Sequence, residues 1–275
     1  MTYDQLIKNH LANYKRTKLA ITKPENWRGG VKEYHYILPK DKRELNFLSA
    51  YRHETENYVK AEKIKLHQFF HHLNSSQAMC LNFFYPLIVE HQLSLVLKVL
   101  NLPDEQIEEA AFEHILPGGE KTNFDFYMKL KSGKEILFEI KYMEKGFGKS
   151  TSCETLERQY QNVYREMLTG KIRSGVDELE ALGKNYQLLR NIAHLEWGDE
   201  RLLVNICPGQ NLKLHKEYKN VMDKIVVPEL HKNIRMVTWE SLLERMNDQL
   251  EEHPSFSNKL EKHYKEFEEK YLQVQ

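Results

Sequence analysis

The chain has 275 residues, of which 41% are hydrophobic and 29% charged, a composition typical of a folded domain with a substantial core. Its 40 Lys and Arg balance its 40 Asp and Glu, so the net charge neither indicates nor excludes nucleic-acid binding. Three widely spaced cysteines exclude a disulfide framework, and no apolar run approaches the roughly 18 residues of a membrane span, so we expect a cytoplasmic, soluble protein with no membrane partner.

The first part of the chain is basic. Residues 1–70 carry 14 Lys and Arg against 8 Asp and Glu, a net charge of 14 − 8 = +6. Residues 1–43 are also aromatic, with a loop around Trp27 and Arg28. Two interpretations stay open: an arm that packs on the rest of the protein, or an arm whose side chains stack on bases and contact phosphates. We interpret residues 1–73 as a basic, helical N-terminal extension.

The apolar spacing in residues 44–73 predicts a helix. His67, His71 and His72 near its end could suggest zinc, because the first two are four residues apart. No further ligand follows at a suitable spacing, and a polar helix end is the alternative.

Ser75 or Ser76 is a candidate N-cap for a helix over residues 78–100, which is apolar nearly all round and therefore expected to be buried. Glu90 is one of its few polar residues. It could be a metal ligand, or it could lie at the helix surface.

A short helix is predicted from Pro103 to about residue 111, followed by a strand over residues 112–116. Glu113 on that strand is a second candidate for an additional metal ligand.

Residues 123–142 predict a β-hairpin, because two runs of apolar residues alternate with period two around a loop at 131–133. Gly133 is suited to the left-handed position that ends a loop of this length. The resulting register sets Phe126 opposite Phe138 and Asp125 opposite Glu139. Lys141 follows two residues after Glu139.

Directly opposed residues of a hairpin have Cβ atoms about 5 Å apart, so the carboxylates of Asp125 and Glu139 would repel. A hard divalent cation would remove that conflict, and Lys141 could contact a phosphate or a metal-bound water. This arrangement suggests metal-assisted attack on a phosphodiester. The alternative is a solvated acidic strand face, which is the commoner origin of such residues.

The remaining elements follow in an alternating order. After a basic loop at 144–149, the pattern predicts helices over 154–168, from 176 or 184 to 196, over 211–223, over 239–250 and from 251, with strands over 202–207 and 234–238. The strand at 202–207 is apolar throughout and is expected to be buried on both faces. The fold class is therefore α/β, a mixed sheet flanked by helices, with residues 74–250 as the core and 251–275 as a C-terminal helix packing on it.

The hairpin residues and the order of the elements resemble the PD-(D/E)xK nuclease superfamily, which has the restriction-endonuclease-like fold. Asp125, Glu139 and Lys141 match its acidic pair and lysine, while Phe124 stands where its pattern has proline. The longer context resembles one branch of restriction endonucleases. The matching segments are 75–77, 122–125, 139–144 and 187–191.

The resemblance implies a Mg²⁺-dependent endonuclease that acts on double-stranded DNA, with Mn²⁺ able to substitute and restriction or host defence as its role. Asp125 and Glu139 would hold the metal, with Glu90 or Glu113 as the third acid. Lys141 would position the attacking water, and Gln187 is a further candidate catalytic residue. A homodimer is also considered. The alternatives are an RNA-directed nuclease and an inactive nucleic-acid-binding protein of the same fold.

Overall fold

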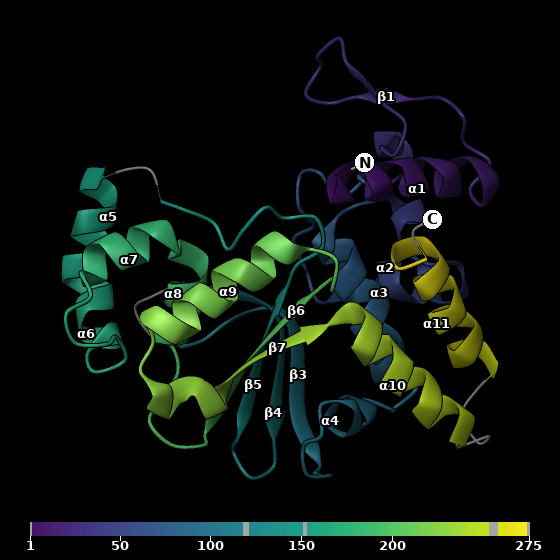
Figure 1. The fold of residues 1–275 in the computed structure, drawn as a ribbon. Coiled ribbons are helices and arrows are strands. Elements are labelled where there is room, and N and C mark those ends of the chain that lie inside the picture. The colour runs from purple at the N-terminus through teal and green to yellow at the C-terminus, as the bar shows by residue number, and fades with distance from the viewer. Residues whose placement is uncertain (1, 118–120, 151–152, 253–257, 274–275) are drawn as a thin grey trace. The chain divides into compact units, whose positions relative to one another are not determined.

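The computed structural model describes residues 2–117, 121–150, 153–252 and 258–273. The chain divides into two compact units, one made of residues 107–237 and the other of residues 1–106 together with 238–275 (Figure 1). The predicted division into residues 1–73, 74–250 and 251–275 groups residues by their expected part in the fold. It stays a prediction.

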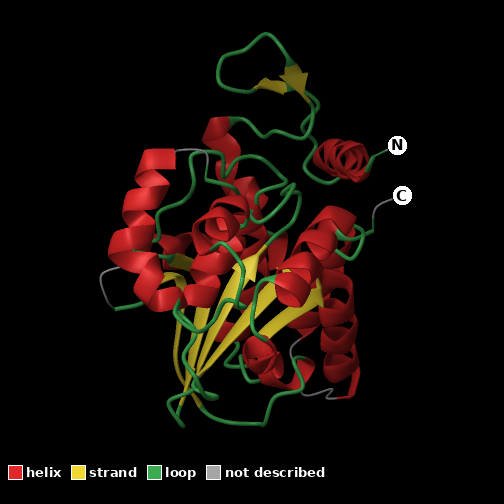
Figure 2. Ribbon diagram, turned by 60° about the vertical axis from the view of Figure 1, so that its left-hand side comes forward, coloured by secondary structure: helices red, strands yellow, loops and turns green. Residues whose placement is uncertain are grey.

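The 107–237 unit is built on one sheet, whose strands are yellow in Figure 2. The sheet has five strands in the order β3-β4-β5-β6-β7. Neighbours β3, β4 and β5 are antiparallel, whereas β5 and β6 run parallel, so the sheet is mixed. The strands are β3 (Ile107–Ile115), β4 (Asn123–Leu130), β5 (Glu135–Ile140), β6 (Arg201–Cys207) and β7 (Ile234–Thr238).

Helices join the parallel strands and cover one face of this sheet. Leu137 and Leu203 on that face share a hydrophobic core with Leu188, Leu189 and Val221 from the helices. Those between β5 and β6 are α5 (Cys153–Gln159), the π-helical turn η3 (Tyr160–Tyr164), α6 (Arg165–Leu168), α7 (Glu178–Lys184) and α8 (Tyr186–Ala193); between β6 and β7 lie α9 (Leu212–Lys224) and η4 (Pro228–Asn233).

Both faces of the hairpin are buried. Phe126 and Phe138 on the predicted apolar face have no exposed surface, and Leu137 and Tyr127 on the other face have 0% and 2%. Alternation with period two is typical of half-buried strands, but here both faces are covered, because helices lie on the face that carries the acidic residues.

The second unit is helical. Trp239, Phe83, Tyr264 and Phe267 form its aromatic centre, with ring centroids of Phe83 5.2–5.5 Å from the other three. Its elements are α1 (Tyr3–Thr17), β1 (Glu25–Asn26), β2 (Glu33–Tyr34), η1 (Lys40–Asn46), η2 (Ser49–Tyr51), α2 (Arg52–Ala61), α3 (Ser76–Val89), α4 (Leu95–Val99), α10 (Trp239–Glu252) and α11 (Asn258–Tyr271).

The long helix predicted over residues 78–100 is wrong in length. Ser75 caps it as expected, accepting from the Ala78 amide at 3.3 Å, but α3 ends at Val89. His91 then adopts a φ of +55°, and the Gln92 amide donates to the Leu87 carbonyl at 2.7 Å. This is the hydrogen-bond pattern of a Schellman C-cap, which ends a helix without needing a glycine when histidine takes the left-handed position.

Two further predictions differ from the structure. Residues 103–111 do not form a helix, because β3 begins at Ile107 and pairs with β4 along its whole length. The helix expected over 44–73 is broken into η1, η2 and α2 and ends at Ala61. In residues 103–111 the pairing with β4 outweighs a helical pattern whose periodicity is weak.

The predictions of the fold class and of the buried strand β6 are confirmed. The fold class is α/β with a mixed sheet flanked by helices and a helical N-terminal segment. Strand β6 is central and its side chains from Leu202 to Cys207 are buried, as the apolar run predicts. Residues 253–257, at the start of the predicted C-terminal helix, lie outside the described residues. Among the described residues, no helix has the length and apolar character to cross a membrane.

Candidate active site

The β4–β5 hairpin has the predicted register. Phe126 pairs with Phe138 and Met128 with Ile136, and the Leu130 amide donates to the Lys134 carbonyl at 2.8 Å. Gly133 closes the loop with a φ of +92°, the left-handed conformation that glycine adopts at little cost. Loop length and turn chemistry therefore position the two strands as the sequence indicates.

The β4–β5 ladder ends at the pair Phe126 and Phe138, immediately before Asp125 and Glu139. The Asp125 carboxylate accepts a hydrogen bond from the Ile140 amide at 2.6 Å through its Oδ2 atom. On the opposite edge of β5, the hydrogen bonds to β6 continue past Ile140, since the Lys141 amide donates to the Ile206 carbonyl at 2.8 Å. The hairpin thus opens where the acidic residues stand, and a side chain takes the place of a main-chain acceptor.

Glu139 is held by three donors. Lys141 Nζ lies 2.7 Å from Glu139 Oε1, and Gln187 Nε2 donates to the same oxygen at 2.6 Å. Asn191 Nδ2 donates to Glu139 Oε2 at 2.8 Å. Lys141 Nζ also donates to Gln187 Oε1 at 2.6 Å, so the three side chains form a closed ring of hydrogen bonds. The carboxylate and the lysine are almost completely buried, with 2% and 4% exposed.

Helix α8 supplies two of these donors because Gln187 and Asn191 are four residues apart and lie on the same face. The start of the helix is joined to the loop that follows Lys141: the Gln187 amide donates to the Phe147 carbonyl at 3.0 Å. Phe147 is fully buried, and Gly148 follows with a φ of +73°. The loop predicted as flexible and basic is thus anchored by one aromatic side chain next to the site.

Burial and like charge act together on Asp125. Removal from water raises the pKa of Asp125 well above its ordinary value, and the negative charge of Glu139 raises it further. For Lys141, burial alone would lower the pKa, but Glu139, Glu144 and Asp125 outweigh it, and the pKa is raised. Lys141 is therefore a cation, and Asp125 holds its proton to a higher pH than an ordinary aspartate.

The two candidates for a third acidic metal ligand, Glu113 and Glu90, belong to different units of the chain. Glu113 lies on β3 between residues that pair with Phe126 and Phe124, and its charge is one of the causes of the raised pKa of Asp125. Its carboxylate accepts a hydrogen bond from Asn123, and its φ of +52° is unusual within a strand. Glu90 belongs to the other unit, where it caps α3 and accepts from the Tyr51 hydroxyl at 2.6 Å.

The structure brings together Asp125, Glu139, Lys141 and Gln187 of the predicted site residues. It adds Asn191, which sequence reasoning missed. The available signal was the four-residue spacing from Gln187, which places both side chains on one face of the helix but does not say what that face meets.

The donor set suits Mg²⁺. Among the residues that the structure describes, no three His, Cys, Asp or Glu side chains gather to hold a metal, and the three histidines at 67–72 form no such group. Mg²⁺ is commonly bound by one or two carboxylates together with waters and substrate phosphate, rather than by a complete protein cage. Asp125 and Glu139 provide two carboxylates whose mutual repulsion a divalent cation would relieve.

Fold and site together define an α/β protein with a buried carboxylate–lysine cluster where its central strands end. A family model described as "Restriction Endonuclease associating with ARP" matches residues 8–272, and the chain belongs to this family. The resemblance to restriction endonucleases drawn from the motifs is confirmed at the level of the family. No curated protein and no solved structure matches the chain.

Proposed function

We propose that this chain is a Mg²⁺-dependent endonuclease of the PD-(D/E)xK type that hydrolyses phosphodiester bonds in DNA. The observation that carries the proposal is the convergence of Asp125, Glu139, Lys141 and Gln187 from a hairpin and one helix. Membership in a restriction-endonuclease family supports a nuclease. The metal, the DNA substrate and the restriction or host-defence role belong to the proposal.

The charges of the site favour this chemistry. When Asp125 is ionised, two carboxylates and one lysine leave a net negative site that would repel a phosphodiester. Asp125 and Glu139 would hold Mg²⁺, which when bound supplies a positive charge and Lewis acidity. With the repulsion removed, the substrate phosphate can approach Lys141.

In this proposal Lys141 acts on the phosphate or on the attacking water. Its Nζ atom is already oriented by hydrogen bonds to Glu139 and Gln187, so little conformational freedom is lost when substrate binds. As a cation in a buried site, it stabilises the negative charge that develops on the phosphorane oxygens. Gln187 acts by holding both Lys141 and Glu139, and Asn191 by fixing the second oxygen of Glu139.

The proposal is tested by incubating the protein with supercoiled plasmid, single-stranded DNA and RNA, each with Mg²⁺, Mn²⁺ or EDTA. Plasmid cleavage that requires a divalent cation is the expected result. Cleavage of RNA alone would favour the RNA-directed alternative. Binding without cleavage under every condition would favour the inactive nucleic-acid-binding protein.

A further inference from the structure

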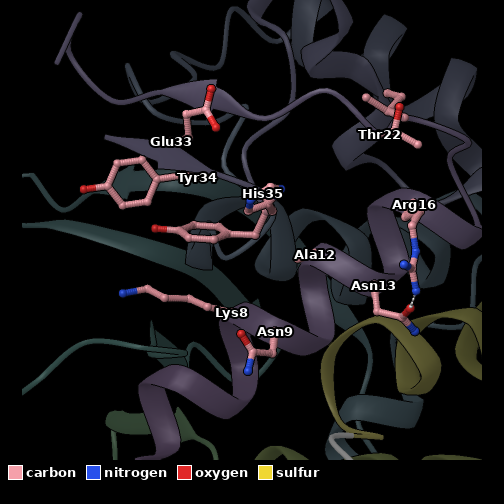
Figure 3. Close-up of a pocket in the computed structure, with 11 residues that line it drawn as sticks. Lys8, Asn9, Ala12, Asn13, Arg16, Thr22, Glu33, Tyr34 and His35 are labelled. Atoms are coloured by element: carbon pink, nitrogen blue, oxygen red, sulfur yellow. Dashed lines mark hydrogen bonds between the residues drawn. The ribbon is translucent and has the colours of Figure 1, made fainter. Parts of the chain in front are cut away.

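A cleft lies far along the chain from the site residues, in the N-terminal segment. It is about 460 Å³ in volume and lies between α1 and residues 21–36 (Figure 3). Its size falls in the range of small-ligand sites. The lining combines basic, amide and aromatic side chains, among them Lys8, Asn13, Arg16, Thr22, Tyr34 and Tyr36.

The wall opposite α1 is anchored at both ends by one buried lysine. Lys15 Nζ donates to the Lys23 carbonyl at 2.6 Å and to the Ile37 carbonyl at 2.5 Å, and this residue is only 1% exposed. Between these points the chain runs out and returns through the β1–β2 pair (Figure 1). A buried ammonium group must be paired. Lys15 is paired with these two carbonyls, and it thereby holds the segment between them against α1.

One end of the cleft is aromatic and cationic. The rings of Tyr34 and Tyr36 lie 5.9 Å apart, edge to face. Lys8 Nζ is 5.8 Å from the Tyr36 ring, and Figure 3 shows Lys8 and Tyr34 pointing to the same side. Lys8 also pairs with Asp4, but a half-exposed pair within one helix holds its partners weakly.

The other end of the cleft carries Arg16, Asn13 and Thr22 (Figure 3). Arg16 donates to Asn13 Oδ1 at 2.8 Å, a neutral partner that leaves the charge of the guanidinium uncompensated by that bond. Lys8 and Arg16 are separated by about 12 Å along the helix, given a rise of about 1.5 Å per residue. Residues 1–43 as a whole contain 10 Lys and Arg against 4 Asp and Glu.

We propose that this cleft binds unpaired nucleotides of a nucleic acid, with a base on Tyr34 and phosphates on Lys8 and Arg16. The proposal rests on the proposed function in that it takes the substrate to be a nucleic acid. Its location puts it on residues 8–36, whereas every group assigned to the chemistry lies between residues 125 and 191. The cleft is a second contact for the substrate and takes no part in cleavage.

Unpaired nucleotides fit this cleft better than a duplex. Aromatic stacking requires the face of a base, which a duplex buries between neighbouring pairs and a single strand exposes. The Asn9, Asn13 and Thr22 side chains provide both donors and acceptors for base edges. A protein that reads only duplex phosphates needs basic residues without this aromatic wall.

Binding of labelled oligothymidine in EDTA, followed by fluorescence anisotropy, tests the proposal without any cleavage. Tyr34→Ser should weaken binding about five- to one-hundred-fold, the range for loss of one base–aromatic stack. Arg16→Ala should reduce the slope of log K against log salt concentration by about 0.7, the value for one phosphate contact on a single strand. Circular dichroism and melting temperature check that each variant is folded.

Arg43→Ala is the matched control, because it removes the same charge from an exposed position of the same segment outside the cleft. Equal effects of Arg16→Ala and Arg43→Ala would overturn the proposal and leave only general charge attraction. Unchanged binding by Tyr34→Ser would also overturn it.

The outcomes separate this proposal from the nuclease assignment. A wild-type protein that cuts no nucleic acid but binds oligothymidine through Tyr34 and Arg16 contradicts only the catalytic proposal. A protein that cuts plasmid equally well in all three variants, with unchanged oligothymidine affinity, contradicts only the cleft.

Discussion

Glu139 is the residue on which the site depends. Its two carboxylate oxygens accept from Lys141, Gln187 and Asn191 at 2.6–2.8 Å, and it is 2% exposed. A buried carboxylate is tolerated only when paired and hydrogen-bonded, and all three partners meet that requirement. Burial and the charge of Glu139 raise the pKa of Asp125, so a bound cation would relieve a repulsion at this carboxylate.

The raised pKa of Asp125 predicts a pH dependence. Between the ordinary value of 3.8 and the folded-state value, the folded protein binds more protons than the unfolded one, so the contribution of this group to stability falls as pH rises. Mg²⁺ must also displace that proton. We therefore expect Mg²⁺ to raise the melting temperature more at about pH 8 than at about pH 5, because less proton competes.

Asp125→Asn supplies the comparison for this prediction. Without metal it should melt at a higher temperature than wild type near pH 8 and at a similar temperature in strong acid, because the amide carries no charge to bury. Equal Mg²⁺-induced shifts at both pH values in the wild type would contradict the role given to this carboxylate.

Lys141→Met should destabilise the protein by about 3–5 kcal/mol, since it leaves the Glu139 charge buried without its cation. Addition of Mg²⁺ should recover part of that loss by providing another positive charge. Urea unfolding with and without Mg²⁺ measures both effects. Lys129→Met is the matched control in the same hairpin: it breaks an exposed pair with Glu108 and should change stability far less.

At the scale of elements, the hairpin could be predicted and the helix contacts could not. Alternation and a loop ending in Gly133 determine which residues of β4 and β5 face each other, since both are local properties. Which side of α8 meets the sheet depends on packing between segments distant in sequence. The segment 187–191 could be singled out from the sequence, but only the structure shows that Asn191 meets Glu139.

The wrong elements have the same origin. The helix predicted over 103–111 is a strand because β4 offers a complete ladder, a partner that no local pattern reveals. The predicted helix over 78–100 stops at Val89 because His91 takes a left-handed conformation that apolar periodicity does not register. Strand β6 was predictable because its own run of apolar residues requires burial.

Helix α8 yields a prediction of its own. Asn191→Ala removes the donor to Glu139 Oε2 and should reduce nuclease activity or metal affinity about 10- to 100-fold, as loss of a supporting hydrogen bond to a ligand does. Asn185→Ala is the control, because its buried amide bonds only to the Ala181 carbonyl among the contacts described. Equal losses in cleavage rate for the two variants would show that Asn191 matters for stability alone.

At the scale of the molecule, the chemistry and the excess charge belong to different parts of the chain. All of the converging groups come from the 107–237 unit, whereas the basic surplus of +6 lies in residues 1–70. The family match extends over both, from residue 8 to 272. In a nuclease of this kind, substitutions in the 107–237 unit would reduce the cleavage rate. Substitutions in the other unit would reduce the affinity for the substrate.

The central claim is that Asp125 and its neighbours cut DNA with a divalent cation. The most direct measurement is the initial rate of supercoiled-plasmid cleavage in Mg²⁺ by wild type, Asp125→Asn and Asp223→Asn, an exposed aspartate of the same unit. We predict cleavage at equal rates by wild type and Asp223→Asn, and none above the EDTA background by a folded Asp125→Asn. Cleavage by Asp125→Asn at the wild-type rate would contradict the account.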